Sequence, residues 1–154
     1  QTDLPVWVGL SCCESKFDNS IVGRNFRAEK EKSLIYDEKK YKEQPKFLPE
    51  DDIIQFEDII KTLTNMGGDV YGIMHTWFQD SSGGLKIIKD HWKGPMMYYP
   101  EIHKFDTSTH EAIAMSTEDE FANSCLEFID DQIQIIGGCC GVSDTHLKKL
   151  IEKF

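Results

Sequence analysis

The 154-residue sequence predicts an α/β fold built around a parallel sheet. Short apolar runs of strand length alternate with segments of helical periodicity, which is typical of βαβ units. The strand segments are apolar at nearly every position, as expected for strands that are buried on both faces. Polar residues suited to chemistry follow directly after these strands. In α/β proteins, sites are built at that edge of the sheet.

The first two βα units are predicted as follows. Leu4–Leu10 is a buried strand because most of its residues are apolar. Asp51–Met66 is the clearest helix: its apolar residues recur at helical spacing, acidic residues occupy its first turn, and Gly67-Gly68 ends it. Asp69–Met74 is a short strand, and Gly84–Trp92 is an amphipathic helix.

The third unit consists of the strand Pro95–Tyr99 and the helix Glu118–Ile129, preceded by Thr117-x-x-Glu120, which has the form of a capping box. The fourth unit is the strand Gln132–Gly137 with the helix Asp144–Phe154. Four such units would make half of a (β/α)8 barrel with two open edges. Because the chain begins at Gln1 with no Met before it, we expect residues 1–154 to be a partial barrel domain of a longer protein.

One segment interrupts this pattern. Residues 14–50 are polar and crowded with charge, and connections in α/β units usually have about 2–6 residues. We interpret 14–50 as an insertion, either a solvated surface excursion or a lid over the site, because it follows the carboxyl end of a strand.

The composition limits the classes of partner. Acidic residues outnumber basic ones by 27 to 17, for a formal charge of −10, which argues against binding to nucleic acid or anionic membranes. No stretch reaches the roughly 18 apolar residues of a membrane span. The five cysteines are odd in number and include adjacent residues, unlike a secreted disulfide framework. We therefore expect a cytoplasmic protein.

The most informative motif is Gly137-Gly138-Cys139-Cys140-Gly141, where a predicted strand meets a loop. Adjacent cysteines are strained as a disulfide pair, so a staple is a weak explanation for them. Two thiolates at a strand end form a soft-metal site, and glycines permit close approach to the backbone. This motif predicts metal binding.

The motif and the residues after it, Val142 to Leu147, resemble the C-terminal signature of the homocysteine S-methyltransferases. Leu4–Val8 resembles the Pro-Val-Trp strand of that family, and Tyr99-Pro100-Glu101 its Tyr-Pro segment. The resemblance covers nearly the whole chain outside 14–50. It implies a zinc-dependent (β/α)8 TIM barrel, with helices outside, of which this chain is roughly the C-terminal half.

The resemblance also implies the chemistry. Cys139 and Cys140 would be two ligands of Zn²⁺, and the thiol of homocysteine would take the open position and accept a methyl group, giving methionine. The donor stays open between S-methylmethionine, S-adenosylmethionine, betaine and a folate or corrinoid carrier. The alternative is a non-catalytic relative that binds homocysteine or zinc, or a redox protein that uses the adjacent thiols.

The third zinc ligand is where the sequence departs from the family. The family has a cysteine at the end of the strand that aligns with Asp69–Met74, and this chain has His75 there. A set of two cysteines and one histidine with an open position is a known catalytic arrangement. Cys12 or Cys13 is the competing candidate, and a site without a third protein ligand is the remaining possibility. With an imidazole ligand, the bound thiolate would be less nucleophilic and the donor or acceptor preference altered.

Other polar residues are weaker candidates. Tyr99 and Glu101 close a strand at the predicted active edge, where they either bind substrate or pack. The histidines at positions 91, 103 and 110 have no partner at metal-ligand spacing, so we expect them at the surface.

Overall fold

The computed structural model describes residues 3–15, 17–24, 34–35, 53–106, 109 and 111–154, so most of the predicted insertion 14–50 lies outside the described residues. The strands are β1 (Trp7–Leu10), β2 (Cys12–Glu14), β3 (Ile21–Gly23), β4 (Leu34–Ile35), β5 (Val70–Trp77), β6 (Met96–Glu101), β7 (His103–Asp106), β8 (Glu111–Ala114) and β9 (Ile133–Ile136). The helices are α2 (Phe56–Met66), α3 (Ser81–His91), α4 (Glu118–Phe128) and α5 (Asp144–Lys153).

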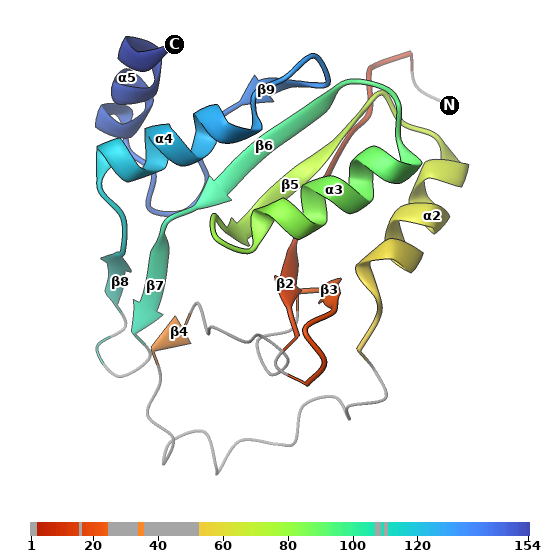
Figure 1. Ribbon diagram of the computed structural model, residues 1–154, viewed down its shortest axis with the longest axis horizontal. Coiled ribbons are helices and arrows are strands. Elements are labelled where there is room, and N and C mark those ends of the chain that lie inside the picture. Colours follow the sequence, from red (N-terminus) through yellow and green to blue (C-terminus); the bar gives the residue numbers. More distant parts are fainter. Residues whose placement is uncertain (1–2, 16, 25–33, 36–52, 107–108, 110) are drawn as a thin grey trace.

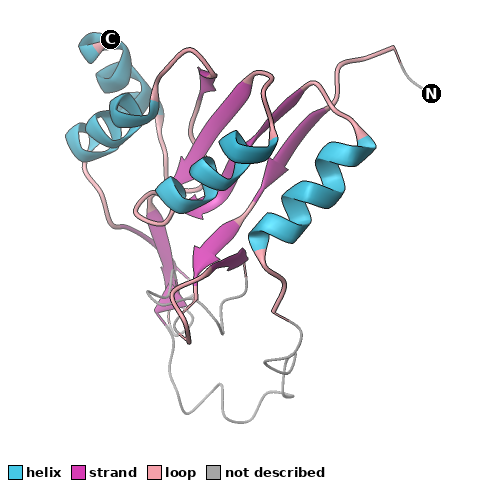
Figure 2. Cartoon of the chain, turned by 45° about the vertical axis from the view of Figure 1, so that its right-hand side comes forward, coloured by secondary structure: helices cyan, strands magenta, loops and turns pink. Residues whose placement is uncertain are grey.

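A four-stranded sheet forms the centre of the fold. Its order is β1-β5-β6-β9, and all three pairings are parallel. The predicted α/β fold with a parallel sheet is therefore confirmed. Because the strands are parallel, their carboxyl ends meet at one edge, which is the lower edge in Figure 1. Helices follow the strands in sequence, and α2, α3 and α4 cover one face of the sheet (Figures 1 and 2).

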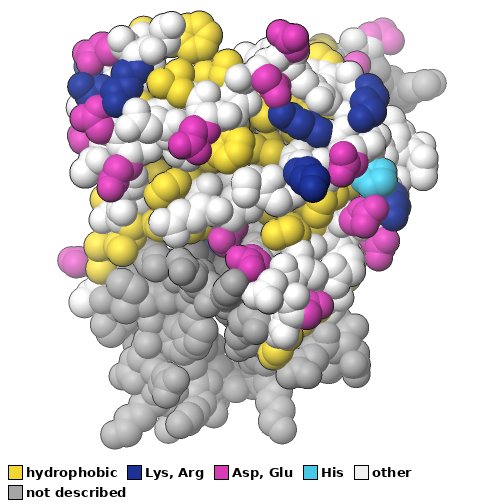
Figure 3. Space-filling view, viewed as in Figure 1, with side chains coloured by type: hydrophobic (Ala, Val, Ile, Leu, Met, Phe, Trp, Pro, Cys, Tyr) yellow, Lys and Arg dark blue, Asp and Glu magenta, His cyan; other side chains and the backbone are white. Residues whose placement is uncertain are grey.

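The core lies between this sheet and the helices. Its largest fully buried side chains are aromatic or aliphatic and come from both layers: Tyr71, Tyr98, Phe56, Phe121, Ile60 and Ile73. The rings of Tyr98 and Phe128 meet edge to face, with centroids 5.2 Å apart. Cys125 on α4 is fully buried in this core, where its thiol packs as a small apolar group. On the face of the molecule that α2, α3 and α4 form, acidic and basic side chains are interspersed between apolar ones (Figure 3).

The predicted helix signals are confirmed where they are local. Thr117 and Glu120 form a reciprocal capping box, with Glu120 N–H donating to Thr117 Oγ1 at 3.3 Å and Thr117 N–H donating to Glu120 Oε2 at 2.8 Å. Gly67 ends α2 with a φ of 101°, a backbone conformation that favours glycine. In contrast, α3 begins at Ser81, three residues before the predicted start.

Five strands lie outside the predicted set, and a sixth, β5, extends a predicted strand. β2 and β3 form an antiparallel pair. β4 pairs with β7, and β7 pairs with β8, in a separate three-stranded sheet. β5 continues three residues beyond its predicted end at Met74. These additions lie beside or beyond the carboxyl edge of the main sheet (Figure 1), so they surround the predicted site.

Apolar side chains are exposed on the outer strand β1 and on the last helix. Trp7 on β1 is 52% exposed, Ile151 on α5 is 73% exposed, and Phe154 directly after α5 is 84% exposed. A pocket of about 430 Å³ lies there, lined by Ile133, Ile136, Leu150 and Phe154 among others. Among the described residues, none of the helices has the length and apolar character to span a membrane.

Candidate metal centre

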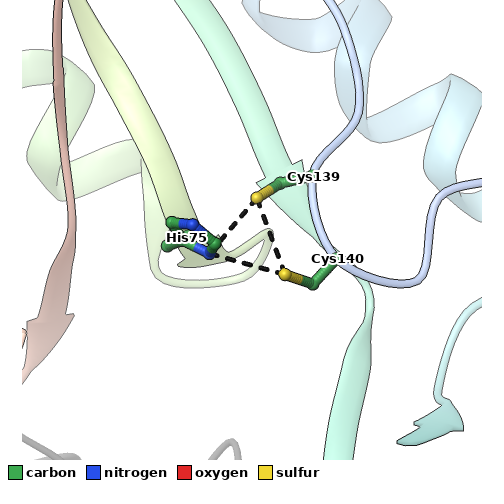
Figure 4. Close-up of side chains that lie close together, drawn as sticks. All are labelled: His75, Cys139 and Cys140. Carbon is green, nitrogen blue, oxygen red and sulfur yellow. Dashed lines mark hydrogen bonds between the residues drawn. The ribbon is translucent and has the colours of Figure 1, made fainter.

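Three side chains converge at the carboxyl edge of the sheet. Nδ1 of His75 lies 3.3 Å from Sγ of Cys139 and 3.5 Å from Sγ of Cys140, and the two sulfur atoms are 3.8 Å apart (Figure 4). His75 comes from β5, and the cysteines come from the loop after β9. The side chain of His75 is about half exposed, so the cluster is accessible from outside.

The position of His75 depends on an irregularity in β5. The register between β5 and β6 shifts between Met74 and Trp77, and His75 has a φ of 50°. This left-handed conformation is uncommon for a residue other than glycine and marks a position that the surrounding structure must hold. Bulges of this kind re-aim a side chain. Here the bulge turns the imidazole of His75 toward the two cysteines.

Neighbouring groups hold the bulge through hydrogen bonds to its backbone and to the side chain of Thr76. Ser11 Oγ donates to the carbonyl of Met74 at 2.9 Å, and Cys12 N–H donates to Oγ1 of Thr76 at 3.0 Å. The guanidinium of Arg24 donates through Nη1 to the carbonyl of His75. The polar residues after β1 therefore fix the end of β5, which gives Ser11 and Cys12 a structural part in the site.

The cysteine loop is hydrogen-bonded to the end of β6 and to the residue after it. Cys139 N–H donates to the carbonyl of Pro100 at 3.0 Å, and Ile102 N–H donates to the carbonyl of Cys140 at 3.0 Å. Gly137 permits this approach, because a Cβ there would lie 2.1 Å from Cε1 of Tyr99. Tyr99 is half-buried, and its ring packs against Gly137 at the start of this loop.

Glu101 lies next to the cluster and is almost completely buried, with a side chain 4% exposed. Its Oε1 forms an ion pair with Nη2 of Arg24 at 2.6 Å, and its Oε2 lies 4.0 Å from Nδ1 of His75. A buried carboxylate requires a compensating charge, which Arg24 supplies. Arg24 thus contacts both Glu101 and the backbone of His75.

The electrostatic setting of Cys140 opposes a free thiolate. Partial burial raises the pKa of the Cys140 thiol above its ordinary value, and the neighbouring Cys139 and Glu101 raise this pKa further, while Arg24 lowers it. A cation bound to the sulfur would reverse this preference, because a coordinating thiol is deprotonated outright. Without a cation the site therefore disfavours the negative charge of the Cys140 thiolate, whereas a bound cation would stabilise that charge.

The ligand spacing can be compared with that around a tetrahedral zinc ion. With Zn–S bonds of about 2.3 Å and Zn–N bonds of about 2.0 Å, the two sulfurs would be about 3.8 Å apart and each sulfur about 3.5 Å from the nitrogen. The observed distances of 3.8, 3.3 and 3.5 Å agree with these values. His75, Cys139 and Cys140 are one of the groups that could hold a metal ion, and the residues present fit zinc.

The competing cysteines lie elsewhere. Cys12 and Cys13 are both buried, and neither forms a disulfide bond among the described residues. Burial raises the pKa of Cys12 to about 12, and its sulfur packs toward α3, where a Cβ at Gly84 would lie 2.5 Å away. Cys13 packs with Val22 and Ile53. Among the described residues, neither cysteine belongs to a group that could hold a metal ion.

The prediction for His103 was wrong. It was expected at the surface without metal partners, but it is half-buried, and Glu101, His103 and Cys140 form a second group whose ligand atoms lie within 4.8 Å of one another. Its Nδ1 is buried without a hydrogen-bond partner among the described residues. Glu101 and His103 are two positions apart, so a period-2 strand pattern after Pro100 is the signal that would have placed both on one side.

The remaining histidines have local partners or lie outside the described residues. His91 Nε2 lies 3.0 Å from Glu57 Oε1 at the surface. His146 belongs to the cap of α5, with Ser143 N–H donating to its Nδ1 at 3.2 Å. His110 is outside the described residues.

The sequence that carries this cluster and most of the sheet is similar to a known protein family. A family model described as homocysteine S-methyltransferase matches residues 42–154, which contain β5, β6, β9 and all three side chains of the cluster. No curated protein matches the chain.

Proposed function

The chain belongs to the homocysteine S-methyltransferase family, and from this premise we propose that it transfers a methyl group from an activated donor to the thiol of homocysteine, with zinc held by His75, Cys139 and Cys140. The observation that carries the proposal is the agreement between the three ligand distances and the spacing around a tetrahedral ion. Three protein ligands with a fourth position open are the arrangement of a catalytic rather than a structural zinc site.

When bound, zinc would lower the pKa of the homocysteine thiol and so supply the thiolate nucleophile near neutral pH. The protein residues bind and orient. The bulge in β5 and its contacts with Ser11 and Arg24 hold the imidazole of His75 in place. The backbone hydrogen bonds from Cys139 to Pro100 and from Ile102 to Cys140 hold the two sulfurs beside it. Preorganised ligands of this kind need little rearrangement when substrate binds.

We propose that the four βα units form half of a (β/α)8 barrel. The support is the parallel order β1-β5-β6-β9 with a helix after each strand in sequence, together with the exposed Trp7 on the outer strand β1, which a further strand would cover. The site then lies at the carboxyl ends of the strands, where barrels of this class place their chemistry.

The proposed function is tested by incubating the protein, loaded with zinc, with homocysteine and each donor in turn: S-methylmethionine, S-adenosylmethionine, betaine and a methylfolate or methylcorrinoid. We expect methionine from at least one donor. We expect none from the Cys139→Ser/Cys140→Ser variant, while Cys125→Ala, which removes a thiol outside the cluster, retains activity. Zinc binding without methionine from any donor would contradict the proposed activity and favour a binding role.

A further inference from the structure

Arg24 is a cationic side chain placed beside a site that is suited to a cation. It follows β3 directly, its side chain is 23% exposed, and it lies outside residues 42–154 that match the family. A positive charge this close to a bound metal ion opposes metal binding by Coulomb repulsion. The position of Arg24 therefore requires an explanation other than its charge.

The backbone that carries Arg24 is held in place by neighbouring segments. Its N–H donates to the carbonyl of Ser11 at 3.1 Å. Gly23, the residue before it, pairs with Cys12 in the β2–β3 hairpin, and the N–H of Gly23 donates to the carbonyl of Ile54 at 2.9 Å. The guanidinium of Arg24 thus extends toward the cluster from a fixed base.

The guanidinium joins Glu101 to the backbone of His75. Nη2 of Arg24 pairs with Oε1 of Glu101 at 2.6 Å, and Nη1 donates to the carbonyl of His75. The donors of a guanidinium lie in one plane at fixed angles, so the pairing with the buried Glu101 directs Nη1 at that carbonyl. The carbonyl belongs to the residue with a φ of 50°, a conformation that persists only where its surroundings impose it.

We propose that Arg24 is a positioning residue: anchored on Glu101, it holds the left-handed backbone of His75 and so directs Nδ1 of His75 into the zinc site. The inference rests on the proposed zinc-dependent function. Without this contact, His75 would relax toward regular strand geometry, in which successive side chains point to opposite faces of the sheet. The carboxylate of Glu101 balances the charge of Arg24, which reduces the repulsion between Arg24 and a bound cation.

Charge and position make opposite predictions for Arg24→Met. If Arg24 acted by charge alone, its loss would raise the zinc affinity, because a positive charge would be removed and the carboxylate of Glu101 left unbalanced. We expect the zinc affinity to fall by on the order of 10–100-fold, as for other residues that orient a metal ligand. Competition with a chromophoric chelator measures it. Lys86→Met removes an exposed positive charge on α3 and is the matched control, with unchanged affinity.

The identity of the ligands gives a readout that a general loss of structure would not reproduce. X-ray absorption by bound zinc distinguishes sulfur from imidazole ligands, because the imidazole ring adds its own outer-shell scattering. We expect two sulfurs and one imidazole in the wild-type protein. In Arg24→Met the two sulfurs of Cys139 and Cys140 should remain and the imidazole signal should be lost.

A second variant keeps the test valid if Arg24→Met does not fold, because that change leaves a buried carboxylate without its partner. Arg24→Met/Glu101→Gln removes both charges together, so the net charge beside the metal is unchanged. The contact with the carbonyl of His75 is still absent, and we expect the same loss of affinity and of the imidazole signal. Circular dichroism should show that this variant is folded.

The results that would overturn the proposal can be told apart. A higher zinc affinity in Arg24→Met would show that Arg24 acts by its charge. Wild-type affinity and a wild-type imidazole signal in Arg24→Met/Glu101→Gln would remove Arg24 as a positioning residue and leave the proposed function standing. A wild-type protein that binds no zinc, or binds it without an imidazole signal, would remove the proposed zinc site together with this inference.

Discussion

The backbone N–H of Cys139 donates a hydrogen bond of 3.0 Å to the carbonyl of Pro100. Pro100 is still within β6, whereas Cys139 lies three residues past the end of β9, so this bond continues the pairing with β6 into the cysteine loop. The ligand set is therefore only as well placed as the β5–β6–β9 pairing.

Replacing His75 tests the third ligand directly. His75→Ala should lose most of the bound zinc, because only Cys139 and Cys140 would remain, whereas His75→Cys should retain it with three sulfur ligands. Zinc content after dialysis, measured by plasma emission spectroscopy, gives the answer. An alanine variant that keeps a full equivalent of zinc would show that His75 is not a ligand.

Zinc affinity should fall as the pH is lowered. The pKa of the Cys140 thiol is raised by burial and by its acidic neighbours, so the thiol carries a proton at neutral pH that the cation must displace. Below that pKa, the apparent affinity should drop by roughly tenfold per pH unit for this proton. Chelator competition between about pH 6 and pH 8 measures the slope. The slope should be shallower in Cys140→Ser; an equal slope in both proteins would contradict this assignment.

Gly137→Ala should destabilise the protein and disturb the cysteine loop. The new Cβ would lie 2.1 Å from Cε1 of Tyr99, and overpacking of this kind costs about 1–3 kcal/mol. Urea unfolding measures the loss. In a Tyr99→Ala background the same change should cost much less, because the ring that it meets is absent; an equal cost in both backgrounds would point to backbone strain instead.

Thr117→Ala should lower the free energy of unfolding by about 1 kcal/mol, because it removes the side chain that accepts from Glu120 N–H at the start of α4. Ser116→Ala, one residue earlier, should change it by less than about 0.5 kcal/mol. Urea midpoints of the two variants separate a capping effect from a general sensitivity of this turn. Equal losses would argue against the capping box as the source of stability.

Local patterns in the sequence predicted the elements that local physics determines. The capping box at Thr117, the glycine stop of α2 and the four apolar strands all depend on residues close together in the chain, and all are found. The start of α3 was predicted three residues late, because Ser81–Gly84 has low helix propensity. In the structure, Gly84 packs so closely that a Cβ would lie 2.5 Å from Cys12 Sγ, so a tertiary contact outweighs the propensity.

The sequence predicted which residues form the candidate site, but it predicted only part of how they are arranged in space. The sequence indicated His75, Cys139 and Cys140 as candidate ligands from a motif and a strand end. It could not indicate the bulge that turns His75, because the register shift depends on pairing between β5 and β6. Arg24 and His103 were missed for the same reason: their contacts with Glu101 and Cys140 join distant segments, including strands outside the predicted pattern.

The sequence separation of the ligands has a consequence for how the protein folds. His75 and the two cysteines are 64 and 65 positions apart, with α3, β6 and α4 between them. Closing such a loop costs entropy that contacts formed later must offset, so the cluster assembles late during folding. The rate at which a refolding chain takes up zinc would thus report the rate of the last stage of sheet assembly. Zinc present during refolding would also shift the folding equilibrium toward the native state.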